Sequence, residues 1–276
     1  MAFSVNTNIG AMVALESLTK TTGELAMTQK RIATGYRVAD AQDDGAAYAV
    51  AERVRGDIAA TTSANDQLGN AQGMISVANT ALGNVDSTLQ NLKGLAVKLA
   101  DGTLTTSQRT QYQAQAKELT NNIASFIKNA NYNGRNILND PSSTANNVVQ
   151  DGSGTIYTIN GYSALTNVYN VVSGANAWTA GDAAAALTAT GAVTAAIDST
   201  LSQLNQFGSY AKYVGAQITY NNAVIDAQNS GIGALVDADM AKESAQLQAL
   251  QIRQQLGTQA LSIANQAPQS LLSLFR

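Results

Sequence analysis

The feature that most constrains this chain is a run of apolar residues spaced alternately three and four positions apart. Every position of the run is apolar: Leu68, Ala71, Ile75, Ala78, Leu82, Val85, Leu89, Leu92, Ala96 and Leu99. This spacing is typical of a helix that packs lengthwise against another helix, as in a coiled coil. Asp101-Gly102 follows the run, and glycine readily adopts the left-handed conformation that ends a helix, so we predict an end there.

Two further runs have the same spacing. One comprises Tyr112, Ala116, Leu119, Ile123, Phe126 and Ala130, and the turn-like sequence NANYNG follows it at 129–134. The other comprises Val193, Ile197, Thr200, Leu204, Phe207, Ala211, Val214, Ile218, Asn221, Ile225, Gln228, Ile232 and Leu235. As one helix it would span roughly 65 Å. Its polar members Thr200, Asn221 and Gln228 either fix the register inside the seam or lie near solvent, and the sequence leaves both readings open.

The segment 141–190 between these runs differs in composition. It is rich in Ser, Thr, Gly, Asn and Tyr, and β-branched and aromatic residues gather at 155–160 and 165–172, on either side of Gly161-Tyr162-Ser163. This pattern predicts a hairpin. Trp178 is expected to pack against the fold, although aromatics among polar residues could instead form a sugar-binding surface. The fold class predicted is mainly α, with long coiled-coil-like helices from both termini and a small β-hairpin region in the middle.

Composition excludes several function classes. The chain has 16 Lys+Arg against 19 Asp+Glu, without the clustered basic face that nucleic-acid binding needs. It contains no cysteine and no histidine, so we predict no catalytic, metal or cofactor site. No apolar run is long enough to cross a membrane. The N-terminal sequence lacks the basic region and cleavage site of a signal peptide, so any export is expected without one.

Both ends of the chain are almost free of charge. Residues 1–19 carry one charged side chain, Glu16, and residues 244–275 carry one, Arg253. A surface helix of a soluble monomer normally has a charged face opposite its apolar one. At 100° per residue the C-terminal segment instead has two separate apolar stripes, the first formed by Ile252, Leu256, Ala260 and Ile263 and the second by Leu250, Leu261 and Ala264.

Two apolar stripes on one helix need partners on two sides. The N-terminal segment offers one partner, and other copies of the chain are the economical source of the second. We therefore predict a self-assembly interface that comprises Leu15, Leu18, Leu25, Ile32, Leu250, Ile252, Leu256, Leu261, Ile263 and Leu271. A membrane-surface helix would carry Lys or Arg on its polar face, and a disordered tail would be less apolar.

Longer motifs then give a family resemblance. The chain resembles bacterial flagellin in five segments: VNTNIGAM, RIATGYRVADAQDDGAAYAVAERVR, NANYNGRNIL, LVDADMAKES and ANQAPQSLLSLFR. The long run ANTALGNVDSTLQNLKGLAVKLA is also similar to the long inner helix of that family. The resemblance covers nearly the whole chain except the central insert, and the large variable outer domains of many flagellins are absent.

The resemblance implies a structural subunit that polymerises into the hollow filament of the bacterial flagellum. By this match, residues 1–44 and 237–276 are the inner domain, and 45–236 are the outer helical domain, with the insert at about 141–190. The implied location is extracellular, after export through the flagellar type III apparatus without a cleaved signal peptide. The implied partners are further copies of the chain, an export chaperone, the hook–filament junction protein and the filament cap.

Two groups of polar residues have expected roles. Salt bridges between inner and outer domains, within or between subunits, are expected from Arg31, Arg37, Asp40, Asp43, Asp44 and Arg53, because the acidic cluster lacks the spacing of a calcium loop. Asp237 and Asp239 are expected to cap the last helix. In flagellins that the innate Toll-like receptor recognises, an Arg, a Leu and a Glu align with Asn91, Leu95 and Gln115. Only the leucine is kept, so the resemblance implies weak or absent receptor signalling.

Three other functions compete with the filament subunit. A hook–filament junction protein would share the terminal helices, and a surface carbohydrate-binding adhesin would act through residues 141–190. A hydrolase using carboxylates is disfavoured, because no pair of acidic residues is suitably placed, and we predict that the chain is not an enzyme.

Overall fold

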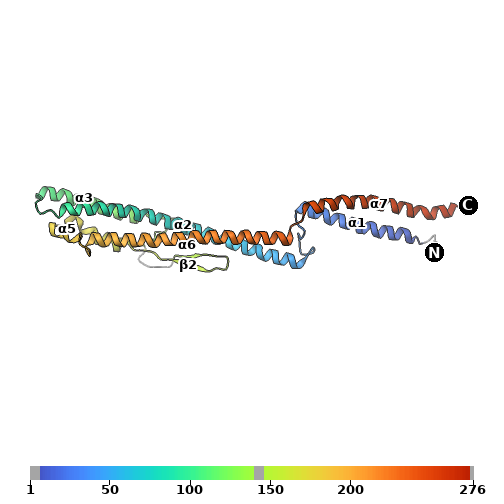
Figure 1. Ribbon diagram of the computed structural model, residues 1–276, viewed down its shortest axis with the longest axis horizontal. Helices are drawn as coiled ribbons and strands as arrows, with labels where there is room; N and C mark the ends of the chain where they lie inside the picture. The colour runs from blue at the N-terminus through green and yellow to red at the C-terminus, as the bar shows by residue number, and fades with distance from the viewer. Residues whose placement is uncertain (1–6, 140–145, 274–276) are drawn as a thin grey trace. The chain divides into compact units, whose positions relative to one another are not determined.

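The computed structural model describes residues 7–139 and 146–273, with side chains as far as residue 266. Long helices dominate this part of the chain (Figure 1), which confirms the predicted fold class. The elements in order are α1 (Ile9–Thr34), α2 (Gly45–Leu99), α3 (Thr106–Asn129), β1 (Asn146–Val149), β2 (Ile156–Ile159), η1 (Leu165–Tyr169), α4 (Asn170–Val172), η2 (Ser173–Ala177), α5 (Ala180–Ala186), α6 (Ala192–Val236) and α7 (Met240–Ser273).

The chain divides into two compact units. The terminal unit consists of Met1–Gly56 and Ala227–Arg276, and the central unit consists of Asp57–Asp226. Two of the long helices, α2 and α6, contribute residues to both units. The terminal unit therefore combines the two ends of the sequence, and the central unit is one continuous stretch of chain.

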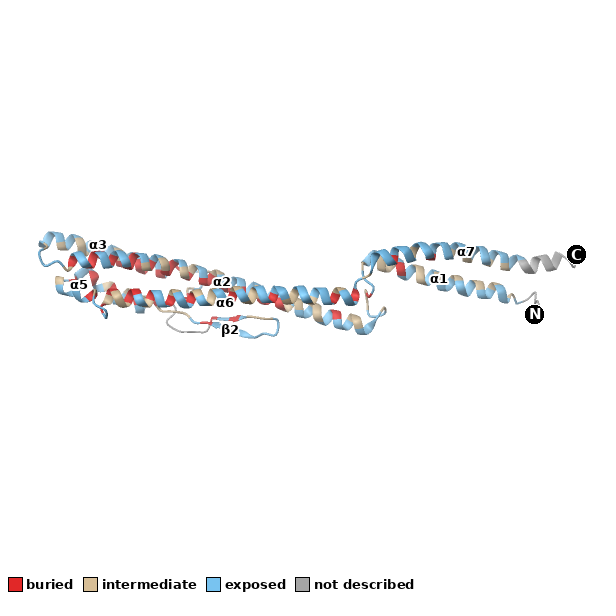
Figure 2. Ribbon diagram, viewed as in Figure 1, coloured by how far each residue is buried: buried red, intermediate tan, exposed pale blue. Residues whose placement is uncertain are grey.

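The core of the central unit follows the longest apolar run of the sequence. All ten positions from Leu68 to Leu99 are buried, as predicted, and buried segments recur along α2 in Figure 2. The facing positions of α6 include Val193, Phe207 and Val214, which belong to the same core. Because burying a leucine or isoleucine side chain contributes about 1.5–3 kcal/mol, this seam is the main stabilising feature of the unit.

Each of the other two runs departs from the prediction at one position near its C-terminal end. In α3 the predicted core residue Phe126 is partly exposed, and its neighbour Ile127 is buried instead. Thr120 is also buried there, and its hydroxyl is satisfied because it donates to the Lys117 carbonyl at 2.8 Å. In α6 Leu235 is exposed and Val236 is buried. A straight helix drifts by about 20° per heptad against a strict seven-residue repeat, so over a helix as long as α6 the buried face moves to a neighbouring residue.

The polar positions in the α6 seam are buried at two of three places. Thr200 is fully buried and donates to the Ala196 carbonyl at 2.8 Å. The amide nitrogen of Asn221 donates to Asn65 Oδ1 and to the Gln150 carbonyl, both at 2.8 Å. These bonds join α6 to α2 and to the turn after β1. Asn221 thus lies inside the seam rather than near solvent, while Gln228 is only half-buried.

The central insert contains a hairpin, but with a different partner strand from the one predicted. Strand β2 lies within the predicted segment 155–160, yet it pairs antiparallel with the upstream strand β1, with Val149 opposite Ile156. The segment 165–172 is helical instead. Its residues Val168 and Val172 are fully buried, at the four-residue spacing that a helix places on one face. Packing of these two side chains therefore outweighs the strand preference of the β-branched residues in this segment.

Two smaller predictions in the central unit are confirmed. The turn at 129–134 is present, with both Asn133 (φ 49°) and Gly134 (φ 78°) in the left-handed region, as a tight turn between Tyr132 and Arg135 requires. Trp178 is buried, and its carbonyl accepts a hydrogen bond from Gln113 Nε2 at 3.0 Å. Trp178 is therefore a packing residue.

Candidate self-assembly surface

Helices α1 and α7 pack side by side as an antiparallel pair (Figure 1). Near the chain ends Asn8 Nδ2 donates to the Ala264 carbonyl at 2.7 Å. Further along, Leu18 lies so close to α7 that a Cβ at Gly257 would come within 3.1 Å of its Cδ1 atom. At the other end Arg31 pairs with Glu243 at 3.2 Å. The pair is thus fixed at three points along its length.

Local sequence sets where α1 begins and ends. Asn8 caps the N-terminus, since its side-chain oxygen accepts from the Ala11 amide at 3.1 Å. Gly35 ends the helix in the left-handed conformation (φ 75°), and its amide donates to the Arg31 carbonyl at 2.8 Å. Asp239 caps α7 as predicted, with its Oδ1 atom accepting from the amides of Ala241 and Lys242.

The predicted interface residues separate into two groups. In one group Leu250 is buried within the subunit (2% exposed), and the half-buried members are Leu18, Leu25, Ile32 and Leu261. The other group is exposed and comprises Leu15, Ile252, Leu256 and Ile263. The side chain of Leu271 lies outside the described residues. One apolar stripe of α7 is therefore open to solvent in the single subunit.

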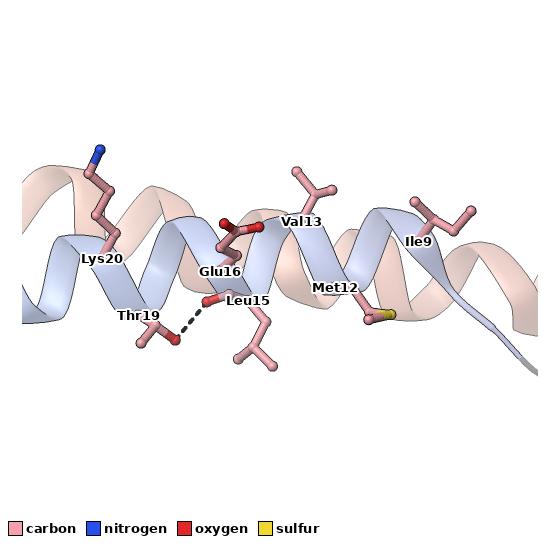
Figure 3. Close-up of a pocket in the computed structure, with 7 residues that line it drawn as sticks. All are labelled: Ile9, Met12, Val13, Leu15, Glu16, Thr19 and Lys20. Carbon is pink, nitrogen blue, oxygen red and sulfur yellow. Dashed lines mark hydrogen bonds between the residues drawn. The ribbon is translucent and has the colours of Figure 1, made fainter.

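Helix α1 carries a second exposed apolar surface that the sequence reasoning missed. A shallow groove is lined by Ile9, Met12, Val13, Leu15, Glu16, Thr19 and Lys20 (Figure 3). Ile9 and Val13 extend from one side of the helix, and Met12 and Leu15 extend from the other. The sequence signal for this surface is the four-residue step from Ile9 to Val13, on a different face from the leucines at seven-residue spacing. We call this groove with the exposed stripe of α7 the apolar terminal surface.

This surface is unusual for a chain that stays single. Leu256 and its stripe neighbours Ile252 and Ile263 are each more than half exposed, as are Ile9 and Val13 on α1. Scattered apolar residues on a surface are ordinary, but apolar residues gathered in stripes mark interaction sites. The charged side chains Glu16 and Lys20 also line the groove, and they extend from the same side of the helix as Val13 (Figure 3).

A charged junction follows α1 in the terminal unit. Lys30 Nζ lies 2.7 Å from Asp40 Oδ2 and 3.0 Å from Asp43 Oδ2. Asp43 Oδ2 also accepts from the Ala39 amide at 3.0 Å. These contacts lower the pKa of both carboxyls and raise the pKa of Lys30, in each case chiefly through the side-chain hydrogen bonds between them. Lys30 was missed because nothing in the sequence pairs it with residues on the following loop.

Backbone hydrogen bonds join the stretch that follows α1 to the end of α6 and the stretch that precedes α7. The Arg37 amide donates to the Val236 carbonyl at 2.7 Å, and the Ala238 amide donates to the Gly35 carbonyl at 3.0 Å. The Arg37 guanidinium also donates to the Leu235 carbonyl. The stretch after α1 and the end of α6 with the stretch before α7 are therefore held together by main-chain hydrogen bonds and by the Arg37 side chain.

The predicted salt-bridge residues are used mainly for local contacts. Asp44 accepts from the amides of Ala46 and Ala47 and so caps the start of α2. Among the described residues, every ion pair joins residues of the terminal unit, and Arg53 belongs to none of them. Salt bridges between domains of neighbouring copies stay a prediction.

The remaining candidate features are the receptor-epitope positions, metal sites and membrane-spanning helices. Of the receptor-epitope positions, Asn91 and Gln115 are exposed and Leu95 is buried, and their role in signalling stays a prediction. The described residues contain no group of three or more acidic residues that could hold a metal ion. In the same part of the chain, none of the helices has the length and apolarity to cross a membrane.

Comparison with family models supports the resemblance at both ends. Residues 5–143 match the bacterial flagellin N-terminal helical region, and residues 190–275 match the bacterial flagellin C-terminal helical region. The unmatched stretch between them lies in the central insert. Both helices of the apolar terminal surface thus fall inside matched regions.

Individual relatives of this chain indicate the same family. Flagellin FljK of Caulobacter vibrioides is 37% identical over 273 residues, which cover 99% of this chain and 98% of the relative. A flagellin of Brucella melitensis is 34% identical over 99% of both chains. Flagellin A of Vibrio cholerae is 32% identical over 56% of this chain but only 41% of its own length. The chain therefore belongs to the bacterial flagellin family, as a short form without large variable outer domains.

Proposed function

We propose that this flagellin, a structural subunit of the bacterial flagellar filament, polymerises through its apolar terminal surface. The observation that carries the proposal is the exposed stripe of α7, represented by Leu256, on a helix whose other stripe already packs on α1. Since α1 serves as the partner within the subunit, further copies of the chain are left to cover the rest. Burial of this surface then drives assembly.

The polar part of α7 suits an interface that excludes water. Between its apolar stripes lie Gln and Ser side chains: Gln248, Gln251, Gln255, Gln259 and Ser262. Neutral amides and hydroxyls can exchange hydrogen bonds with water for hydrogen bonds with a neighbour, without the large desolvation penalty of buried ions. The near-absence of charge therefore supports burial of the whole helix in the assembled state.

The domain roles are part of the same proposal. Residues 1–44 and 237–276 form the inner coiled coil that lines the hollow filament, and residues 45–236 form the outer helical domain. Support comes from the family resemblance and from the terminal unit, which brings both ends of the chain together. In this arrangement the apolar terminal surface faces neighbouring copies of the same unit.

Family membership supports a general statement about location and partners, and a more specific proposal about the export route and the partner proteins. The filament is extracellular, and the subunit assembles with copies of itself. We further propose export through the flagellar type III apparatus without a cleaved signal peptide, and contacts with an export chaperone, the hook–filament junction protein and the filament cap. N-terminal sequencing of filament protein tests the export route, since cleavage of a signal peptide would remove the first residues of the given sequence. The role proposed is structural and not enzymatic, and no observation favours a junction protein or an adhesin.

Truncation tests the assembly surface. Purified full-length protein, given salt and short filament seeds, should form filaments visible by electron microscopy. A variant that lacks residues 244–276 should form none, because it lacks nearly all of α7. Circular dichroism of the same variant should retain a strongly helical spectrum, since the central unit is unaltered. Normal filaments from the truncated chain would show that α7 is dispensable and would remove the basis of the proposal.

A further inference from the structure

We propose that the thioether of Met12 is an oxidation site, at which a peroxide switches the free subunit into a form that assembles poorly. The proposal rests on the proposed function, because it requires the apolar terminal surface to be buried on polymerisation. It goes further in naming a modified atom, the class of reagent and the state of the protein in which the reaction occurs.

Methionines are distributed unevenly between the two units. In the described part of the chain, Met12 (62% exposed), Met27 and Met240 all lie exposed in the terminal unit. The central unit has Met74, which is 7% exposed and belongs to its core. Because the chain contains no cysteine, methionine sulfur is the sulfur that an oxidant meets. The reactive sulfur is thus concentrated near the chain ends.

Met12 is the exposed methionine that lines the groove on α1. Figure 3 shows its side chain directed away from the helix axis, on the same side as Leu15, with the sulfur near the end of the side chain. By contrast, Met240 begins α7 beside Asp239 and Lys242, where polar groups surround it in the sequence. An added polar oxygen would therefore matter most at Met12, because Leu15, which lines the groove on the same side of the helix, is also apolar.

The chemistry needs only hydrogen peroxide. A sulfur lone pair attacks one peroxide oxygen, the O–O bond breaks, a sulfur–oxygen bond forms, and after proton transfer one molecule of water leaves. Sulfur loses two electrons and the peroxide gains them. The product sulfoxide is polar and chiral, whereas the thioether is flexible and apolar, and reductases can reverse the change. No further reactant is required.

Assembly and oxidation should therefore exclude each other. In the free subunit Met12 is accessible, and its sulfoxide places an unpaired hydrogen-bond acceptor on a surface that must lose its water during polymerisation. In the filament the same sulfur is covered and protected. Peroxide should inactivate unassembled subunits while leaving finished filaments chemically intact at this position.

The experiment compares the two states of the full chain. Free subunits and seeded filaments are treated with the same hydrogen peroxide solution, and sulfoxide at each methionine is measured by peptide mass spectrometry. Met12 should be oxidised in subunits at least about tenfold faster than in filaments. The critical concentration of treated subunits should rise by at least about tenfold, and treatment with methionine sulfoxide reductases should restore the untreated value.

Variants separate Met12 from the other sites. In Met12→Leu, peroxide should leave the critical concentration unchanged relative to the same variant before treatment. A chain with Met27→Leu and Met240→Leu should keep its peroxide sensitivity. Unaltered polymerisation of wild-type subunits in which Met12 is fully oxidised would overturn the proposal, as would equal oxidation rates in subunit and filament. Failure of untreated wild-type protein to polymerise would instead count against the proposed function.

Discussion

Replacing Leu256 by alanine should weaken polymerisation without a comparable loss of subunit stability. This residue is 59% exposed in the subunit and lies in the apolar stripe of α7 that none of the described residues covers. Leu250 on the same helix provides a matched control, because it is 2% exposed and already buried within the subunit. The two leucines differ in burial but not in chemistry.

The expected magnitude follows from these exposures. Full burial of a leucine contributes about 1.5–3 kcal/mol, so burial of the part of Leu256 still exposed contributes about 1–2 kcal/mol per copy. Loss of that contribution should raise the critical concentration by roughly fivefold to thirtyfold. Leu256→Asp adds a carboxylate that must be buried unpaired, at a cost of several kcal/mol, and should abolish assembly. Leu250→Ala instead leaves a cavity and should reduce subunit stability by about 2–5 kcal/mol.

Seeded polymerisation followed by sedimentation gives the critical concentration, and circular dichroism during urea titration gives subunit stability. The expected pattern is a raised critical concentration with an unchanged unfolding curve for Leu256→Ala, and a shifted unfolding curve for Leu250→Ala. Wild-type polymerisation by Leu256→Asp would refute the reasoning, since a charge cannot be buried there at no cost. An equal loss of subunit stability in both alanine variants would show that Leu256 is covered within the subunit.

Three further predictions concern other parts of the molecule. Gly152→Ala should destabilise the central unit by about 1–3 kcal/mol in urea titration, because the added Cβ would lie 2.7 Å from Thr61 Oγ1 and 3.1 Å from the Thr61 amide nitrogen. Gly69→Ala is the control, and it should be neutral or slightly stabilising, because open space surrounds Gly69. Because the pKa of Asp43 is lowered, its contact with Lys30 stabilises the junction above the ordinary carboxyl pKa of 3.8, and this stabilisation is lost as pH falls through the lowered pKa. Because the pKa of Lys30 is raised, the same stabilisation is also lost well above pH 10.5. Thermal unfolding should therefore separate Asp43→Asn from wild type at neutral pH, and a difference that persisted unchanged in strong acid would contradict this sign. In receptor-reporter cells the wild-type protein should signal weakly, and Asn91→Arg with Gln115→Glu should increase the signal; a full response to wild type would show that these positions do not decide recognition.

The long helices could be predicted from sequence because their core positions repeat over many turns. The seam from Leu68 to Leu99 has no polar member, so the pattern has only one plausible face to bury. The prediction failed at Phe126, because the second buried row of α3 runs through Thr120 and Ile127. It also failed at Leu235, where a 3.5-residue repeat and a real helix have drifted out of phase. Periodicity therefore gave the existence and partners of the helices better than their last turns.

The central insert was harder because its local composition and its packing disagree. Val168 and Val172 favour a strand by residue type, but their spacing places both on the buried face of a short helical segment. The true partner of β2 lies upstream, around Val149, where a short polar stretch gave little strand signal. Strand pairing depends on contacts that a single segment does not encode.

The assembly surface was predicted in part. The two stripes of α7 came from the helical wheel, and the structure leaves Leu256 and Ile263 of the first stripe exposed while Leu250 of the second is buried. Of the groove on α1, Leu15 was predicted, but Ile9 and Met12 were missed, because they lie on a different face of α1 from the seven-residue leucine repeat. What a sequence cannot supply is which of several apolar faces the subunit itself covers.

Cysteine labelling tests the central claim most directly, namely that the apolar terminal surface is buried between copies. The natural chain has no cysteine, so Ile252→Cys introduces one thiol on the exposed stripe of α7. A maleimide reagent should modify this thiol rapidly in the free subunit and at least about tenfold more slowly in the assembled filament. Equal labelling rates in subunit and filament would show that the stripe remains open to solvent, and would contradict the account.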